Sequence, residues 1–221
     1  MKTQVKLSLH VWGEDACFSR PEMKVERVSY DVITPSAARG IFEAILWKPG
    51  LQWTVQQIDV LKPIRWQSLR RNEVGSKIPA QNVATAMKKG VGNLALYIED
   101  DRQQRAGLFL RDVAYVLHAS LSLTERAGPA DNLTKFAAMF KRRLESGQCH
   151  HMPVFGCREF PAYFASPSGT EAPIAESRDL GWMLHDLDFT TGASPEPRFF
   201  RAEMQAGIIE VPEFRAGEVR A

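Results

Sequence analysis

The sequence predicts an α+β protein, and three features of the chain lead to that class. Apolar and polar residues alternate near the N-terminus and again over 113–124, which is the period of half-buried strands. Two segments, beginning near Thr34 and near Asp131, instead place apolar residues every three to four positions, as amphipathic helices do. The chain has 221 residues, of which 44% are apolar, so it is long enough to build a substantial core.

The elements of the N-terminal half are placed by their boundary residues. A strand is expected over 5–11, and the aperiodic segment that follows it is expected to be a loop. Thr34-Pro35 predicts the start of the first helix, because a hydroxyl caps a helix and proline fits its first turn, and Pro49-Gly50 predicts its end. Short strands are expected at 53–60, 64–66 and 94–98, and the basic stretch near 68–90 is expected to be an insertion loop with a short helix.

The strand over 113–124 is the clearest element of the C-terminal half. Its odd-numbered residues are apolar, whereas its even-numbered face carries His118, Ser120 and Ser122. Asp131 is expected to cap the helix that follows, which ends at Gly147. Further strands are expected at 159–164 and 181–189, and as a pair at 199–204 and 208–211.

This order of elements is compatible with the split βαβ (ferredoxin-like) arrangement, which is also the RRM topology. The sequence therefore predicts a ferredoxin-like domain over 1–147, with the insertion near 68–90. The remaining residues, 148–221, are predicted to form a smaller β-rich domain.

Charge is distributed unevenly along the chain, although the net charge is only +2. The stretch from Lys62 to Gly90 has seven basic residues and one acid, whereas the stretch from Glu171 to the end has ten acids and five arginines. Such a distribution indicates a polyanion partner on one face of the protein. A solvated, charged loop without a partner is the alternative interpretation.

No stretch approaches the roughly 20 consecutive apolar residues of a membrane-spanning helix. The alternating N-terminus does not resemble the continuous apolar segment of a signal peptide. Three cysteines without paired spacing fit a reducing compartment. We therefore expect a cytoplasmic protein with no membrane partner.

Several common chemistries have no motif in this chain. A phosphate-binding loop, a Rossmann glycine turn, a G-x-S-x-G elbow and a two-metal acidic pair are all missing from the sequence. Cys149, His150, His151 and Cys157 could supply four zinc ligands, but adjacent side chains rarely converge on one tetrahedral ion. The sequence therefore predicts neither a metal site nor a cofactor.

Two features favour nucleic acid as the polyanion. His118 lies on the polar face of the best strand, where it is either a general acid or base or an ordinary surface imidazole. Aromatic residues stand beside basic ones at Tyr30, Trp47, Trp66 and Tyr97. Bases of single-stranded RNA stack on such rings while arginine and lysine hold the phosphates, although most aromatic residues of a domain this size lie in its core.

Longer strings in the sequence resemble a known family. They are VWGEDACFSRPEMKVERVSYDV, PSAARGIFEAILWKPG, RRNEVGSKIP, RQQRAG, GCREFPA and RDLGWMLHDLDF. In this order, from about Val11 to about Phe200, they resemble the type I-C (Dvulg-type) branch of the CRISPR-associated Cas-five family, part of the RAMP superfamily.

The resemblance implies a ferredoxin-like RAMP domain with a C-terminal β-sheet extension. It also implies an endoribonuclease for the repeat hairpin of pre-crRNA that stays on the 5′ handle of the mature crRNA. Partners would be the other subunits of the type I-C interference complex. The implied cleavage is metal-independent: a ribose 2′-OH attacks the adjacent phosphate and leaves a 2′,3′-cyclic phosphate.

The catalytic residues of the family carry over only in part. The family position before Trp-Lys-Pro is usually Tyr or His, but here it is Leu46, which cannot transfer a proton. The other family positions correspond to His118-Ala119-Ser120, where a histidine is present but displaced by two residues. On this basis His118 is the expected base or acid, with Ser120 on the same strand face, Lys48 as the cation and Tyr30 as a weaker proton donor.

Candidate RNA-binding residues are basic side chains in the loop, the helices and the insertion: Arg27, Arg39, Arg70, Arg71, Lys77, Arg105, Lys141 and Arg142. Two other functions remain open. One is a handle-binding subunit without catalysis, which Leu46 favours. The other is a DNA-directed activity, either duplex binding or metal-dependent cleavage.

Overall fold

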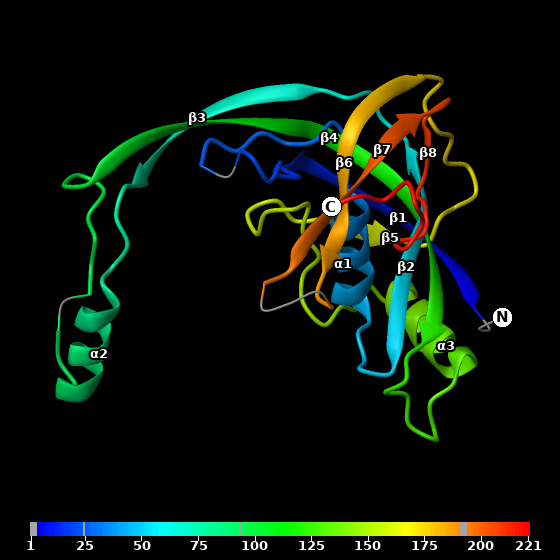
Figure 1. Cartoon of the computed structure of the whole chain (residues 1–221), viewed down its shortest axis with the longest axis horizontal. Helices are drawn as coiled ribbons and strands as arrows, with labels where there is room; N and C mark the ends of the chain where they lie inside the picture. The colour runs from blue at the N-terminus through cyan, green and yellow to red at the C-terminus, as the bar shows by residue number, and fades with distance from the viewer. Residues whose placement is uncertain (1–3, 24, 93, 191–193) are drawn as a thin grey trace.

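The computed structural model describes residues 4–23, 25–92, 94–190 and 194–221. Its main sheet is antiparallel throughout and has six strands, in the order β5-β1-β4-β2-β8, with β3 paired to the other half of β4 (Figure 1). The strands are β1 (Val5–Ala16), β2 (Leu51–Val60), β3 (Trp66–Val74), β4 (Arg102–Leu123), β5 (Tyr163–Ala165) and β8 (Ile208–Glu210). The helices are α1 (Pro35–Ile45), α2 (Ala80–Lys89) and α3 (Leu133–Glu145), and a second sheet pairs β6 (Arg178–Asp188) with β7 (Glu196–Met204).

The core lies between the central strands and the helices α1 and α3. Along β4 the odd-numbered residues Leu117 and Leu121 are fully buried, as the alternation predicts. They face an aromatic cluster in which the ring of Phe42 (α1) lies 4.9 Å from Trp53 (β2) and 5.7 Å from Phe140 (α3). The helices therefore cover one face of the sheet, and the even-numbered face of β4 is the other.

The two covering helices begin with side-chain caps. Thr34 accepts a hydrogen bond from the backbone of Ala37, as the sequence predicts, but α1 ends at Ile45 and not at Pro49-Gly50. The predicted cap of α3 is wrong by one residue, because Asn132 has extended backbone angles and accepts from Lys135 N at 2.8 Å. Asp131 instead accepts from Gly128 N and stabilises the preceding turn.

The predicted basic insertion loop near 68–90 is a structured arm, which we define as β3, α2 and the part of β4 before Leu110. Its two strands continue the sheet away from the body, and α2, which lies between them in the chain, stands at the far end of the arm (Figure 1). No residue of α2 is buried. The short helix predicted in this stretch is confirmed by α2, but the predicted loop is wrong, because β3 pairs with β4 along its whole length, from Trp66 to Val74. The predicted strand at 94–98 is also wrong, since the described residues there are irregular or form a turn.

The C-terminal residues are divided between the two sheets. The two-stranded sheet packs on α1 through β6, and there Asp186 accepts two hydrogen bonds from Arg39, at 2.7 and 3.0 Å. However, β5 pairs with β1 and β8 pairs with β2, so both belong to the main sheet although they follow residue 147. The expected boundary after 147 therefore does not separate two units.

The strands predicted in this C-terminal part need two corrections. The strand expected over 159–164 is reduced to the three residues of β5. The segments 199–204 and 208–211 do not form a strand pair, because β7 pairs with β6 while β8 pairs with β2. No helix among the described residues is long and apolar enough to cross a membrane.

Candidate functional site

His118 lies at the centre of the sheet, on the face that the helices leave open. In the register of the sheet it stands between Ser8 of β1 and Gln57 of β2. Its Nδ1 atom is 2.8 Å from the Ser8 hydroxyl, and its Nε2 atom is 3.0 Å from a carboxylate oxygen of Asp59. The side chain keeps 33% of its surface exposed, so that a ligand can reach the imidazole.

A β-bulge explains how Asp59 comes to lie beside His118. Trp53 and Val55 face the core, so strict alternation would turn Asp59 toward the core as well. The register of β2 against β4 shifts between Val55 and Gln57, and the next core residue is Ile58. This extra residue turns Asp59 to the open face, as bulges commonly do near functional sites.

The open face around His118 forms the floor of a cavity of about 710 Å³. Its lining is mostly polar, and Ser120, which is almost completely buried, lies on the same floor. Its charged lining is mixed: Lys6 and Arg215 are basic, although Arg215 also pairs with Asp188, and Glu210 and Glu213 are acidic. Ser8, Gln57 and Ser122 also line the cavity.

This arrangement can transfer protons and hold an anion. A carboxylate that accepts from one imidazole nitrogen fixes the tautomer and the orientation of the ring, and leaves the other nitrogen available as a base. In that tautomer the Nε2 proton of His118 points to Asp59, and Nδ1 accepts from the Ser8 hydroxyl. A polar substrate with a phosphate group can therefore find both a base and, in Lys6, a cation in one cavity.

Two other residues of the predicted catalytic site, Lys48 and Tyr30, do not meet His118, and neither does Leu46 at the family position. Leu46 is fully buried at the end of α1, on the helix-covered side of the sheet, where its carbonyl oxygen accepts from Trp53 Nε1. Lys48 is exposed in the turn that follows and does not line the cavity within the described part of the chain. Tyr30 is also buried, and burial raises the pKa of its hydroxyl, with the guanidinium of Arg20 4.5 Å above the ring.

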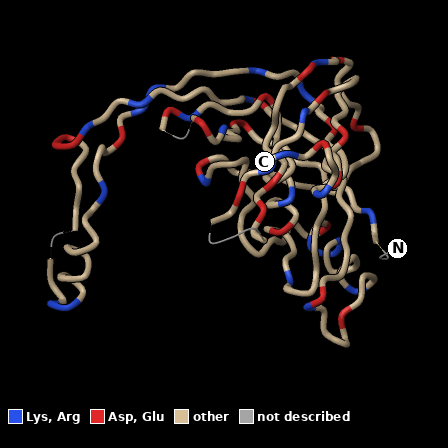
Figure 2. The backbone as a smooth tube through the Cα atoms, in the orientation of Figure 1, with Lys and Arg blue, Asp and Glu red and all other residues tan. Residues whose placement is uncertain are grey.

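The predicted RNA-binding residues fall into three groups. Arg70 and Lys77 are exposed on the arm, and Lys141 and Arg142 are exposed on α3. Figure 2 shows basic residues along the arm strands and at the far end of α2. Arg39 is not available to RNA in this structure, because Asp186 and Glu43 hold its guanidinium.

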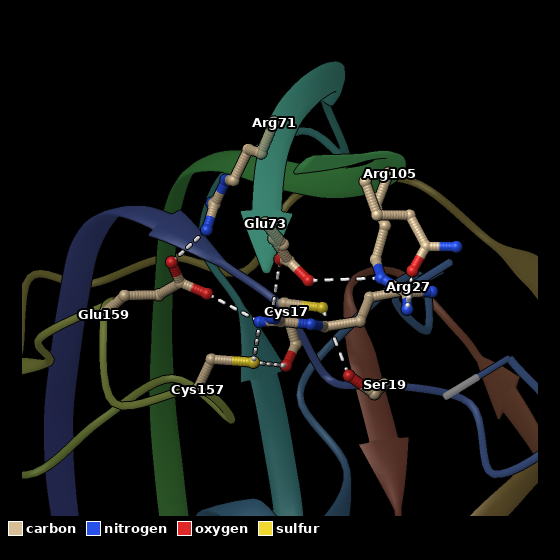
Figure 3. Close-up of polar contacts among 9 residues, drawn as sticks. Cys17, Ser19, Arg27, Arg71, Glu73, Arg105, Cys157 and Glu159 are labelled. Carbon is tan, nitrogen blue, oxygen red and sulfur yellow. Dashed lines mark hydrogen bonds and ion pairs between the residues drawn. The ribbon is translucent and has the colours of Figure 1, made fainter. Parts of the chain in front are cut away.

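The remaining three predicted arginines gather where the arm leaves the body (Figure 3). Arg27 pairs with Glu159 at 2.6 Å and with Glu73 at 3.4 Å. Arg71 pairs with Glu159, and Arg105 pairs with Glu73. We call these three arginines and their partners Glu73 and Glu159, together with Cys17 and Cys157, the arm-base cluster.

The four possible zinc ligands of the sequence, Cys149, His150, His151 and Cys157, belong to two different parts of the structure. The backbone N–H groups of His150 and His151 donate to the carbonyl of Ala44, whereas Cys157 lies in the arm-base cluster. Within the described ranges, no group of three or more His, Cys, Asp or Glu side chains is arranged to hold a metal ion.

Sequence reasoning missed Ser8, Asp59 and Lys6, which come to His118 from neighbouring strands. The irregular apolar spacing from Val55 to Ile58 was the available signal for the bulge that exposes Asp59. Ser8 and Lys6 stand on the polar face of the predicted first strand, but their pairing with β4 depends on the register.

Comparison with known proteins assigns the family. Residues 6–212 match the family model described as CRISPR-associated protein (Cas5), in its Cas5d form. The chain belongs to the Cas5 family. It is 56% identical, over 97% of this chain and 98% of the relative, to a protein of Mannheimia succiniciproducens named CRISPR pre-crRNA endoribonuclease Cas5d. A protein of Thermus thermophilus with the same name is 44% identical over 94% of this chain and 91% of the relative.

Solved structures agree with the α+β, mainly antiparallel fold of this Cas5 protein. A CRISPR-associated protein superposes with a TM-score of 0.71 at 20% identity, and the comparison covers all of both chains. A functionally uncharacterized protein from Streptococcus mutans superposes with a TM-score of 0.70 at 18% identity, also over all of both chains. At these identities the likeness concerns the fold.

Proposed function

We propose that this Cas5 chain is a CRISPR endoribonuclease that binds the repeat hairpin of pre-crRNA and cleaves it. The observation that carries the proposal is the 56% identity, over nearly the whole of both chains, to a relative that bears this name. We further propose that the chain remains on the 5′ handle of the mature crRNA, in contact with other subunits of the type I-C interference complex.

We also propose that residues 4–165 without the arm form a ferredoxin-like RAMP core, extended by β6, β7 and β8. The strand order β5-β1-β4-β2 supports this, with α1 between β1 and β2 and α3 between β4 and β5. In RRM domains of this topology, RNA lies on the sheet face opposite the helices. That face carries His118 and its cavity here.

The reaction we propose needs no metal ion. The ribose 2′-OH loses its proton and attacks the adjacent phosphorus, and the bond from phosphorus to the 5′-oxygen breaks. The products are a 2′,3′-cyclic phosphate and a 5′-hydroxyl, which takes up one proton. The reaction therefore requires a base, an acid and a cation near the phosphate.

His118 is the residue that we assign to proton transfer. Asp59 orients its imidazole, and Ser8 occupies the nitrogen that a ribose hydroxyl would approach. Lys6 replaces Lys48 as the proposed cation, because Lys6 lines the cavity. Tyr30, buried and distant from this floor, is not assigned a chemical step.

A second candidate function is binding of the crRNA handle without cleavage. It is favoured by Leu46, whose aliphatic side chain is fully buried at the position where the family usually has Tyr or His. The exposed Arg70 and Lys77 on the arm are compatible with RNA binding in both functions.

The test is to incubate the purified chain with its own repeat RNA in EDTA and to analyse the ends of the products. Cleavage at one position, with a 2′,3′-cyclic phosphate and a 5′-hydroxyl, is the expected result. Tight binding without a cut would support the handle-binding function instead. Cleavage that occurs without EDTA and is lost in EDTA would contradict the proposed reaction, and so would cleavage of DNA but not of RNA.

A further inference from the structure

Two of the three cysteines meet in the arm-base cluster (Figure 3). Cys17 follows directly after β1, and Cys157 lies in the loop before β5. The N–H of Cys17 donates to the carbonyl of Phe155 at 3.1 Å, which joins the two segments. Gly156 allows this approach, because a Cβ atom there would lie 2.0 Å from the carbonyl oxygen of Cys17.

The two thiols have different surroundings. The sulfur of Cys17 is completely buried and lies 3.3 Å from the hydroxyl of Ser19. The sulfur of Cys157 is half-buried, 3.7 Å from the carbonyl oxygen of Cys17 and 3.7 Å from a guanidinium nitrogen of Arg27. One sulfur is therefore reachable from solvent and is held by a cation, and the other is placed behind it.

These surroundings also separate the acidities of the thiols. The hydrogen bond from the Cys17 thiol and the charge of Arg27 lower the pKa of Cys157 to about 6, against the opposing effects of burial and of Glu159. The pKa of Cys17 is raised by the same interaction and by burial. Cys157 is therefore the more acidic of the two thiols, and it is the one that ionises more readily to the nucleophilic thiolate.

We propose that Cys157 is an oxidation site for hydroperoxides and that Cys17 is its resolving partner, so that the two form a reversible disulfide at the base of the arm. This inference goes beyond the proposed nuclease function and does not depend on it. It rests on one half-buried and one fully buried cysteine, on Arg27 against the half-buried one, and on two backbone segments joined at Phe155.

The chemistry balances with hydrogen peroxide as the oxidant. The Cys157 thiolate attacks one peroxide oxygen, the O–O bond breaks, and a sulfenic acid and hydroxide form. The Cys17 thiol then attacks the sulfenic sulfur, the S–O bond breaks, and a disulfide and water form. Two thiols lose two protons and two electrons overall, and a low-molecular-weight dithiol returns them.

Oxidation changes the charge at the base of the arm. In the reduced cluster Arg27, Arg71 and Arg105 face Glu73, Glu159 and the sulfur of Cys157, which adds a third negative charge when it is ionised. The disulfide removes the thiolate and leaves one positive charge uncompensated. The same bond fixes the loop that carries Glu159, which pairs with two of the three arginines.

The experiment treats the reduced full chain with a small excess of hydrogen peroxide and maps its peptides by mass spectrometry. We expect a Cys17–Cys157 linked peptide that has lost two hydrogen atoms and that disappears after treatment with a dithiol. A Cys149→Ser variant should give the same peptide, because that half-buried cysteine lies outside the cluster. Absence of the linked peptide in the folded wild-type chain would overturn the proposal.

Two variants separate the roles of the thiols. In Cys17→Ala the sulfenic acid of Cys157 should persist long enough to be trapped by dimedone, whereas Cys157→Ser should give no trapped product at either position. If Cys149 or Cys17 reacts with dimedone before Cys157, the assignment is wrong. Because Cys17 is buried in the core, circular dichroism first checks that its variant folds as the wild-type chain does. If the variant does not fold, the proposal is judged on the peptide map of the wild-type chain.

A variant of the cation tests the cause of the reactivity. Arg27→Gln removes the guanidinium from Cys157 and should move the midpoint of iodoacetamide alkylation of that cysteine to higher pH. The neighbouring groups that also face the sulfur, Cys17 and Glu159, are unchanged in this variant. An unchanged midpoint would contradict the role of Arg27.

Discussion

The body and the arm are made of the same long strand but are stabilised in different ways. The half of β4 in the body lies between β1 and β2 and places its odd-numbered side chains in a core closed by α1 and α3. The other half pairs with β3 and, at Leu108, with the segment around Val28, and it lies next to the segment that leads to α2, which buries no residue. The body is therefore stabilised by packing of its apolar core, whereas the arm is stabilised by the hydrogen bonds between β3 and β4 and by the ion pairs of the arm-base cluster.

This contrast predicts very different costs for removing a large apolar side chain. Phe140→Ala removes a buried ring from the aromatic core and should reduce the free energy of unfolding by about 3–5 kcal/mol. Met87→Ala on α2 removes a side chain that is 79% exposed and should change it by less than about 0.5 kcal/mol. Chemical denaturation of both variants measures the difference.

Equal costs in the two variants would show that the arm packs on the body in solution, and the contrast would fail. A loss of more than about 1 kcal/mol in Met87→Ala alone would have the same meaning, since surface substitutions normally cost less.

The second prediction concerns the position of the imidazole in the body. Asp59→Asn keeps the shape of the side chain but removes the carboxylate that orients His118. We expect the single-turnover rate of repeat cleavage to fall by roughly tenfold or more, as part of the contribution of general acid–base catalysis. The affinity for the repeat RNA should stay unchanged, because Asp59 supplies no positive charge.

Glu43→Gln is the control for this experiment, because it also removes a carboxylate but lies on α1, on the helix-covered side of the sheet. A rate loss in Asp59→Asn that is matched by an equal loss of affinity would point to disturbed binding and against an orienting role.

The third prediction concerns the arm. Arg70→Gln together with Lys77→Gln should weaken binding of the repeat RNA and reduce the slope of log K against log salt by about 1 to 2, roughly one unit per lost phosphate contact. The melting temperature should not change, because both side chains are exposed. Fluorescence anisotropy at several salt concentrations measures the slope.

Arg126→Gln with Arg201→Gln provides the matched control, as these two arginines are also exposed but lie on the body. The same reduction of the slope in the control pair would mean that the arm has no special role in binding.

The body could be predicted from the sequence because its apolar residues follow the period of its elements. The strand at Val5, the helix capped by Thr34 and the strand through His118 are all found where the alternation places them. The arm could not be predicted in this way, because its residues are exposed on both faces of β3 and so have no period. Its regular structure comes from pairing with β4, a contact that only the three-dimensional structure shows.

The candidate site was predictable only at its centre. His118 stands on the polar face of a recognisable strand, and the sequence shows it directly. Its partners come from other strands, and Asp59 faces it only because of a bulge. Lys48 stands at the end of the predicted helix, close in sequence to the family position, but the sheet separates that end from the open face.

The most direct test of the account compares two histidines on the same face of the sheet, His118 in β4 and His10 in β1. Each is replaced by alanine, and the rate of repeat RNA cleavage is measured in EDTA under single-turnover conditions. The account predicts a loss on the order of 10²–10⁴ for His118→Ala, which is the usual range for general acid–base catalysis, and a wild-type rate for His10→Ala, which lies outside the cavity. Cleavage by His118→Ala at the wild-type rate would contradict the account.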